Sequence, residues 1–259
     1  MTKIDERAVV CKGAQIGCDV EIGAYAYIGE NVVIGDRCKI YPHAVIDGWT
    51  TIGNDCSIFP FASIGMAPQD VKYKNEKTEL IIGDRNTIRE YVTINRGTTS
   101  GKGKTIIGND NFIMTSCHVA HDCHLSNGIV MANLATLAGH VEVEDYAVIG
   151  GFTAVHQFVR IGTLAMVGGA SAVAQDVAPY TIVSGNRAKL YGLNLVGIKR
   201  RGIEGERLEA LKKAYRLIFK SKLTIAEAKE AIEKQGLLKD EVENLLNFIL
   251  RSSRGVIRW

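Results

Sequence analysis

The sequence predicts a mainly β chain with an α-helical C-terminus: a parallel β-helix of hexapeptide repeats followed by a small helical domain. Three observations support this fold class. An aliphatic residue recurs every six positions through most of the first 180 residues, small or β-branched residues recur four positions after it, and the spacing becomes helical from about residue 206. A period of six matches neither the turn of an α-helix nor the repeat of a coiled coil.

The hexads form three uninterrupted series. Their lead positions are Ile, Val, Leu or Met throughout, over residues 4–64, 82–94 and 107–173. A strand this short cannot bury its own face, so three hexads are expected to form one triangular coil, and stacked coils share a continuous core. With coils about 4.8 Å apart, roughly nine coils give a prism about 40 Å long.

Two interruptions of the repeat predict projecting loops. Residues 66–81 are rich in charge, and residues 100–106 begin with the sequence SGKGKT; both features are typical of surface loops. The repeat ends near residue 185. We therefore expect a β-helical domain over residues 1–185, and a linker with a C-terminal helical domain over residues 186–259.

Helical spacing follows the repeats. It predicts three helices, within residues 207–220, 224–236 and 240–253. The second of them is expected to begin with a capping box formed by Thr224 and Glu227 and to close at Gly236.

Composition limits the class of protein. Hydrophobic residues make up 46% and charged residues 23% of the 259 positions, a balance typical of a globular chain. The opening MTKIDERAVV is too charged for a secretory signal, and the longest apolar run is about half of a membrane span. We expect a cytoplasmic protein without a transmembrane segment. The net charge of +3 does not predict a nucleic-acid partner.

The segment CHVAHDCHLSNG at residues 117–128 concentrates cysteines and histidines. Cys117 and Cys123 share their position in the hexad with Ala135 and Ala147, so both thiols are expected to point into the prism. A structural zinc site needs four ligands that converge on one point, which this phase separates from the outward histidines. We therefore predict no metal site, and the cysteines serve as small buried hydrophobes.

Histidines are predicted to align on one corner of the prism. His121, His140 and His156 follow lead residues that differ by 18 positions, which is one full coil, and His118 faces the same corner. Together with Asp122 they predict a proton-transfer site at neutral pH. Solvated or interface histidines are the alternative.

Longer motifs point to one family. The sequences SIGMAPQDVKY, HVAHDC, LAGHVEV, GGFTAVHQFVRIG and GLNLVGIKRRG occur in this order. With them the chain resembles the UDP-N-acetylglucosamine acyltransferases of the hexapeptide-repeat class, which begin lipid A synthesis. The resemblance implies left-handed coils, a homotrimer with active sites between neighbours, and no cofactor. It also implies two substrates, UDP-N-acetylglucosamine and an (R)-3-hydroxyacyl chain on acyl carrier protein.

The resemblance also implies catalytic roles. His121 is expected to be the general base that takes a proton from the sugar 3-hydroxyl, which attacks the thioester without a covalent acyl-enzyme. Asp122 is expected to orient His121, and the backbone N–H of Gly139 to stabilise the oxyanion. Without the resemblance, Asp122 would be interpreted as a solvated turn residue and Gly139 as a residue that a bend requires.

The resemblance also implies which further residues bind substrate. His118, His140 and Gln157 are expected to hold the sugar nucleotide or the acyl group. Asp70 and Lys72 are expected to reach in from the first loop.

Toward the C-terminus the resemblance implies an acyl site and a nucleotide site. His156 is expected to line the acyl chain, and Gly169 to leave room for a longer one. Asn194 and Arg201 are expected to contact the nucleotide. Val196 stands where the family commonly has glutamate, which leaves recognition of the nucleoside or sugar open.

Several alternatives stay open. The acceptor could be an amino sugar, giving an amide, or the chain could be the related N-acyltransferase that acts two steps later. A zinc carbonic anhydrase on the same trimeric prism and a non-enzymatic scaffold are the others. Basic residues of the first long helix could steer the acidic carrier protein or form a solvated face; they are Lys212, Lys213, Arg216, Lys220 and Lys222.

Overall fold

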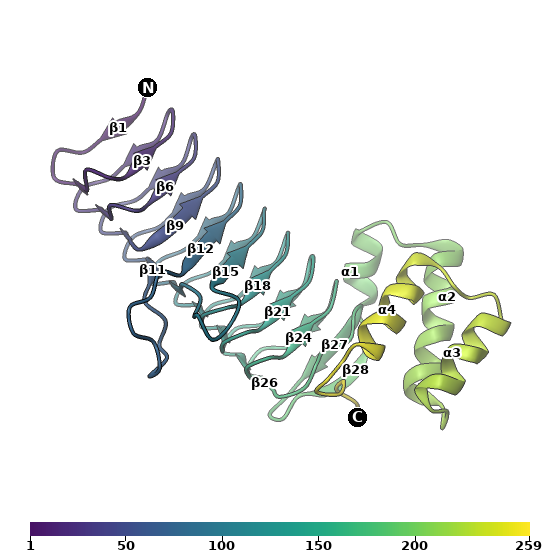
Figure 1. Ribbon diagram of the computed structural model, residues 1–259. Helices are drawn as coiled ribbons and strands as arrows, with labels where there is room; N and C mark the ends of the chain where they lie inside the picture. Colours follow the sequence, from purple (N-terminus) through teal and green to yellow (C-terminus); the bar gives the residue numbers. More distant parts are fainter.

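The computed structural model, which describes residues 1–259, is a prism of stacked three-sided coils with helices at its C-terminal end (Figure 1). Each side of the prism is a sheet of parallel strands, and each strand pairs with the strand one coil away; the antiparallel last strand of sheet A is the exception. Sheet A contains β1 (Lys3–Ile4), β4 (Glu21–Ile22), β7 (Lys39–Ile40), β10 (Ser57–Ile58), β13 (Thr87–Ile88), β16 (Phe112–Ile113), β19 (Val130–Met131), β22 (Val148–Ile149), β25 (Met166–Val167), β27 (Thr181–Ser184) and β28 (Lys189–Leu193).

The other two sides are built in the same way. Sheet B contains β2 (Val9–Val10), β5 (Tyr27–Ile28), β8 (Val45–Ile46), β11 (Ser63–Met66), β14 (Thr93–Asn95), β17 (His118–Val119), β20 (Thr136–Leu137), β23 (Ala154–Val155) and β26 (Ala172–Val173). Sheet C contains β3 (Gln15–Ile16), β6 (Val33–Ile34), β9 (Trp49–Ile52), β12 (Glu79–Ile82), β15 (Lys104–Ile107), β18 (His124–Leu125), β21 (Glu142–Val143) and β24 (Arg160–Ile161).

The lead residues fill the prism as the repeat predicts. In the first column of sheet A, Ile22 and Ile40 are 3% and 2% exposed, whereas Ile4 is 48% exposed because no coil covers the N-terminal end. The thiols of Cys38, Cys56, Cys117 and Cys123 are buried in the same core, which confirms their inward direction.

Both predicted loops are present, with different bounds. The first loop spans residues 67–78, because Met66 ends β11 and Glu79 begins β12; it projects from the prism below β11 in Figure 1. The second loop spans residues 96–103, because Lys104 begins β15. The strands that follow the two loops are longer than a normal hexad strand and pair along their whole length, from Glu79 with Lys104 to Ile82 with Ile107.

The C-terminal part differs from the prediction in two ways. The expected linker contains β28, which pairs antiparallel with β27, so the predicted boundary at 185 falls in a hairpin turn. A short helix, α1 (Leu195–Arg200), precedes the three expected ones. These are α2 (Gly205–Tyr215), continued by the π-helical η1 (Arg216–Lys220), α3 (Ile225–Lys234) and α4 (Asp240–Leu250).

The predicted helix start and stop are confirmed in α3. Thr224 accepts from the backbone N–H of Glu227, whose carboxylate in turn accepts from the Thr224 N–H, and Gly236 follows the helix at a φ of 63°. No helix of the structure combines the length and the apolar character that crossing a membrane requires.

Candidate active site

The predicted histidine corner lies where sheet B turns into sheet C. β17, β20 and β23 are consecutive strands of sheet B, and the backbone N–H of His140 donates to the carbonyl of His121 at 3.0 Å. The rings of His121 and His140 meet edge to face with centroids 5.2 Å apart. The 18-residue rule thus correctly placed His121, His140 and His156 on one edge of the prism.

The three histidines occupy different columns of this corner. His121 lies one coil before Gly139 and two before Gln157, at the same position in the hexad. The next column contains Asp122, His140 and Phe158, all with positive φ, and the His140 ring stacks on Phe158 at 4.4 Å. Stacking against one face of His140 fixes the plane of that imidazole.

Asp122 is buried and completely hydrogen-bonded, so it is not the solvated turn residue that its position alone suggested. Its side chain is 0% exposed, and Oδ2 lies 2.9 Å from Nδ1 of His121. The Thr98 hydroxyl donates to the same oxygen at 2.6 Å, and the Lys102 N–H donates to Oδ1 at 2.9 Å. Thr105 accepts from the Asp122 N–H at 2.9 Å.

These hydrogen bonds decide the charge of Asp122. Burial would raise the pKa of its carboxyl, but the hydrogen bonds from His121 and Thr98 outweigh burial and hold the pKa below its usual value. The group is therefore an ionised carboxylate at neutral pH, held next to an imidazole. Sequence reasoning missed Thr98, Lys102 and Thr105, because they lie outside the six-residue repeat.

Gly139 leaves the space that the His121 ring occupies. A Cβ at position 139 would lie 2.7 Å from Cε1 of His121, closer than real contacts allow. The N–H of Gly139 makes no hydrogen bond within the chain. A free amide donor thus lies directly beside the imidazole.

Burial keeps the neighbouring imidazoles neutral. It lowers the pKa of His118, and the nearby His121 adds to this effect. Burial also lowers the pKa of His140, against an opposing attraction from Asp122. His118 is held in place by a hydrogen bond of 2.7 Å between its Nδ1 and the Thr93 hydroxyl.

The other predicted binding residues are spread over several places. His156 lies on the same edge as His121, whereas Gly169 lies at the corner between sheets A and B. The first loop brings Asp70 near enough to His140 to raise the pKa of that imidazole slightly against the effect of burial. The imidazole of His156 contacts Arg254 at 3.3 Å and borders a groove of about 310 Å³ between β23, β26 and Arg187. A Cβ at Gly169 would lie 3.3 Å from the Gly151 carbonyl. In the first loop, Asp70 accepts from the N–H of Lys72 at 2.9 Å.

Asn194 and Arg201 flank α1 and lie away from His121. Asn194 is the N-cap: its Oδ1 accepts from the Gly197 N–H at 3.0 Å, and its Nδ2 donates to the Leu164 carbonyl at 2.9 Å. Its side chain therefore has a structural role in the single chain. The Arg201 guanidinium lies 3.4 Å from the centroid of the Tyr146 ring, at the corner between sheets C and A.

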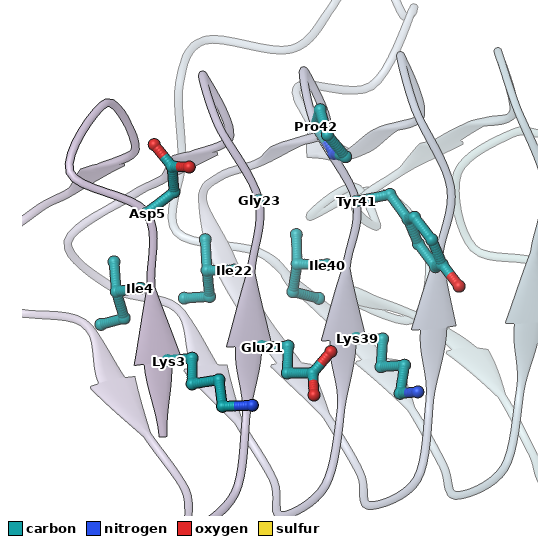
Figure 2. Close-up of a pocket in the computed structure, with 10 residues that line it drawn as sticks. All are labelled: Lys3, Ile4, Asp5, Glu21, Ile22, Gly23, Lys39, Ile40, Tyr41 and Pro42. Carbon is teal, nitrogen blue, oxygen red and sulfur yellow. The ribbon is translucent and has the colours of Figure 1, made fainter. Parts of the chain in front are cut away.

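One groove of the chain lies away from the histidines. It lies at the N-terminal end of sheet A, has a volume of about 460 Å³, and is bordered by Lys3, Glu21 and Lys39 (Figure 2). These side chains alternate in charge along β1, β4 and β7, the first three coils, whereas the histidines lie on another corner and further along the prism. We therefore base the candidate active site on the histidine corner.

Replacing Cys117 or Cys123 by alanine should leave catalysis nearly unchanged. Burial raises the pKa of the Cys117 thiol to about 11 and that of Cys123 to about 12, so neither is a reactive thiolate. Each change should cost about 1–2 kcal/mol of stability through lost packing. Steady-state rates and thermal melting measure the two effects. Loss of turnover in a folded variant would contradict the inward placement of the thiols.

Comparison with models of protein families defines the class of protein to which the chain belongs. Residues 13–48 match the model of bacterial transferase hexapeptide repeats, and residues 176–257 match the second domain of UDP-N-acetylglucosamine O-acyltransferases. The prism of hexads with a histidine corner is therefore that of a hexapeptide-repeat acyltransferase.

Full-length relatives give the family. The chain is 52% identical over 258 residues to the acyl-[acyl-carrier-protein]–UDP-N-acetylglucosamine O-acyltransferase of Thermodesulfovibrio yellowstonii, and 50% identical over 262 residues to that of Herminiimonas arsenicoxydans. Each alignment covers 100% of both chains. The chain belongs to the UDP-N-acetylglucosamine O-acyltransferase family.

Solved structures confirm the fold class, including the left-handed winding that the resemblance implied. The UDP-N-acetylglucosamine acyltransferase of Bacteroides fragilis is 42% identical with a TM-score of 0.95, covering 98% of this chain and 100% of that one. The enzyme of Campylobacter jejuni is 44% identical with a TM-score of 0.94, covering 99% and 100%.

Proposed function

We propose that the chain is a cytoplasmic enzyme that transfers an (R)-3-hydroxyacyl group from acyl carrier protein to the 3-hydroxyl of UDP-N-acetylglucosamine, the first step of lipid A synthesis. The names of the full-length relatives support the reaction and both substrates. The single observation that supports the chemistry is the 2.9 Å contact between Nδ1 of His121 and the buried carboxylate of Asp122. A carboxylate placed there keeps the proton on Nδ1 and leaves Nε2 free to act as a base.

In the proposed reaction the acyl group passes directly from the thioester to the sugar. Nε2 of His121 accepts the proton of the sugar 3-hydroxyl as that oxygen bonds to the thioester carbon. The free N–H of Gly139 stabilises the oxyanion. The carbon–sulfur bond then breaks, and the departing thiolate receives the proton from His121. The electron balance is complete without a covalent acyl-enzyme and without a cofactor.

We further propose that the working unit is a homotrimer. Arg201 lies at the corner between sheets C and A, whereas His121 lies at the corner between sheets B and C, so one chain does not present both to one nucleotide. A neighbouring protomer that presents its Arg201 corner to this His121 corner would complete the site. Asn194 would lie beside the nucleotide in the same neighbour, while its side chain keeps capping α1.

The third corner offers a surface for that assembly. Tyr25, His43, Phe61 and Tyr91 stack there with ring centroids 5.0 to 5.2 Å apart. Phe61 is 48% and Tyr91 56% exposed in the single chain. An exposed aromatic column of this kind is typical of a protein interface.

The carrier protein is proposed to dock on the helical part. Lys212, Arg216 and Lys220 surround a pocket of about 250 Å³ whose floor is formed by Leu193, Leu195 and Tyr215. A basic rim around an apolar floor suits an acidic partner that presents an apolar side chain.

Acyl transfer to an amino sugar is the second candidate. Val196 lies on α1 and is 62% exposed, so the position where the resemblance implies a glutamate offers the acceptor no carboxylate. Zinc chemistry is a further alternative, because ligand atoms of His121, Asp122 and His140 lie within 4.8 Å of one another. Both oxygens of Asp122, however, already accept hydrogen bonds from Thr98 and its neighbours.

One assay separates these alternatives. The protein is incubated with 3-hydroxyacyl carrier proteins of graded length and either UDP-N-acetylglucosamine or its 3-amino analogue, and the products are identified by mass. We expect an ester of the first acceptor. Exclusive formation of the amide would reject the proposed acceptor, and absence of any product would reject acyl transfer. Stoichiometric zinc in the active protein would reject the metal-free scheme.

A further inference from the structure

The second loop encloses the Asp122 carboxylate. Besides His121, every side-chain or backbone donor to this carboxylate comes from that loop: the Thr98 N–H and hydroxyl and the Lys102 N–H. The loop approaches so closely that a Cβ at Gly101 would lie 2.5 Å from the carboxylate carbon. The loop therefore sets the position of Asp122.

The residues that begin the second loop also hold the first loop. Nη1 of Arg96 donates to the Gly65 carbonyl at 2.6 Å, and Nη2 donates to the Tyr73 hydroxyl at 2.9 Å. The Tyr73 hydroxyl in turn donates to the Glu76 carbonyl at 2.7 Å. Asn95 donates to the Ala67 carbonyl at 3.0 Å, at the start of the same loop.

Arg96 is an unusual residue for a purely structural role. Its side chain is buried, with 8% of the residue exposed, and it forms no ion pair with a carboxylate. Its Nε has no hydrogen-bond partner. Burying a guanidinium with only neutral acceptors costs stability, but its rigid fork of donors can hold two chain segments at a fixed separation.

We propose that Arg96 is a positioning residue for the sugar nucleotide: it holds the first loop, with Asp70 and Lys72, in register with the second loop that fixes Asp122. This inference rests on the proposed function. Only Gly97 separates Arg96 from Thr98, so one short segment positions both the first loop and the Asp122 carboxylate. Lysine at position 96 keeps the charge and loses the fork.

The test is steady-state kinetics of Arg96→Lys and Tyr73→Phe with both substrates. We expect the KM for UDP-N-acetylglucosamine to rise about tenfold in Arg96→Lys, the usual worth of a charged hydrogen bond. The kcat should change less than about threefold. Tyr73→Phe should also raise this KM. The double variant should resemble Arg96→Lys, because both single changes remove the same contact between Arg96 and Tyr73.

Arg37→Lys is the matched control. Arg37 also joins two coils through a bidentate contact with Asp55, in which both bonds are 2.7 Å long, but it lies near the N-terminal end of the prism, away from both loops and from Arg201. This variant should keep both kinetic constants. Thr98→Val should instead lower kcat with little change in KM, because it removes a donor to Asp122.

Amide hydrogen exchange supplies a readout that does not need activity. Residues 67–78 should exchange faster in Arg96→Lys than in the wild type or in Arg37→Lys. An unchanged KM, including the case in which only the apparent kcat falls in proportion to the folded fraction, would overturn the inference. If the wild type transfers no acyl group, the proposed function fails, and unchanged exchange in residues 67–78 would then overturn the positioning role separately.

Discussion

Replacing His121 by alanine will lower kcat by about 10²- to 10⁴-fold, the usual contribution of a general base. The loss follows because no other group takes the position of its Nε2: His140 belongs to the neighbouring column, His118 lies on β17, and each makes its own contacts. The fold should persist, since the His121 side chain packs at the surface of the prism and not within it. Turnover at saturating substrate and thermal melting are the measurements.

His124→Ala is the control for this prediction. His124 follows Cys123 closely in the sequence but lies exposed on the outer face of sheet C. Its removal should leave kcat unchanged. If the alanine variant at position 121 turns over at a rate comparable with the wild type, His121 is not the base and the proposed mechanism is wrong.

Asp122→Asn is expected to give the second largest loss, again about 10²-fold or more in kcat. An amide at this position can donate to Nδ1 of His121, which places the imidazole proton on Nε2 and removes the base. The KM values should change little, because the carboxylate is 0% exposed and touches no solvent-facing ligand space. Single-turnover rates with both substrates bound measure this step.

The pH dependence of the stability of Asp122→Asn tests the charge of Asp122. The folded-state pKa lies below the usual 3.8, so the carboxylate stabilises the protein above that pH, and this contribution disappears as the pH falls through the folded-state value. The stability difference between the wild type and Asp122→Asn should therefore be constant near neutral pH and shrink in acid.

The sequence predicted the histidine corner because the repeat is a geometric rule. Once the phase was fixed, the inward direction of Cys117 and the common edge of His121 and His140 followed from counting residues. The rule works because each lead residue faces the same core, so a shift by one position would expose it.

The parts that escaped prediction lie outside the repeat. The contacts of Thr98 and Lys102 with Asp122 come from a loop, whose path depends on the surfaces it meets. Helix α1 has only six residues and contains Gly197, so its spacing gives no helical signal. It forms because Asn194 caps it and Ile198 is buried beneath it. The proposed nucleotide contact of Arg201 would need a second chain, which no pattern in a single sequence places.

The stacking of identical turns also limits how the length of this protein can change. Duplication of one whole coil ahead of the first loop would add a rung and leave every downstream side chain facing as before. Deletion of a single hexad at the same place would rotate the preceding rungs by a third of a revolution relative to His121. The aromatic column of Tyr25 and His43 would then emerge on a different side from Phe61 and Tyr91. Viable length variants of the N-terminal half should therefore differ by multiples of eighteen residues.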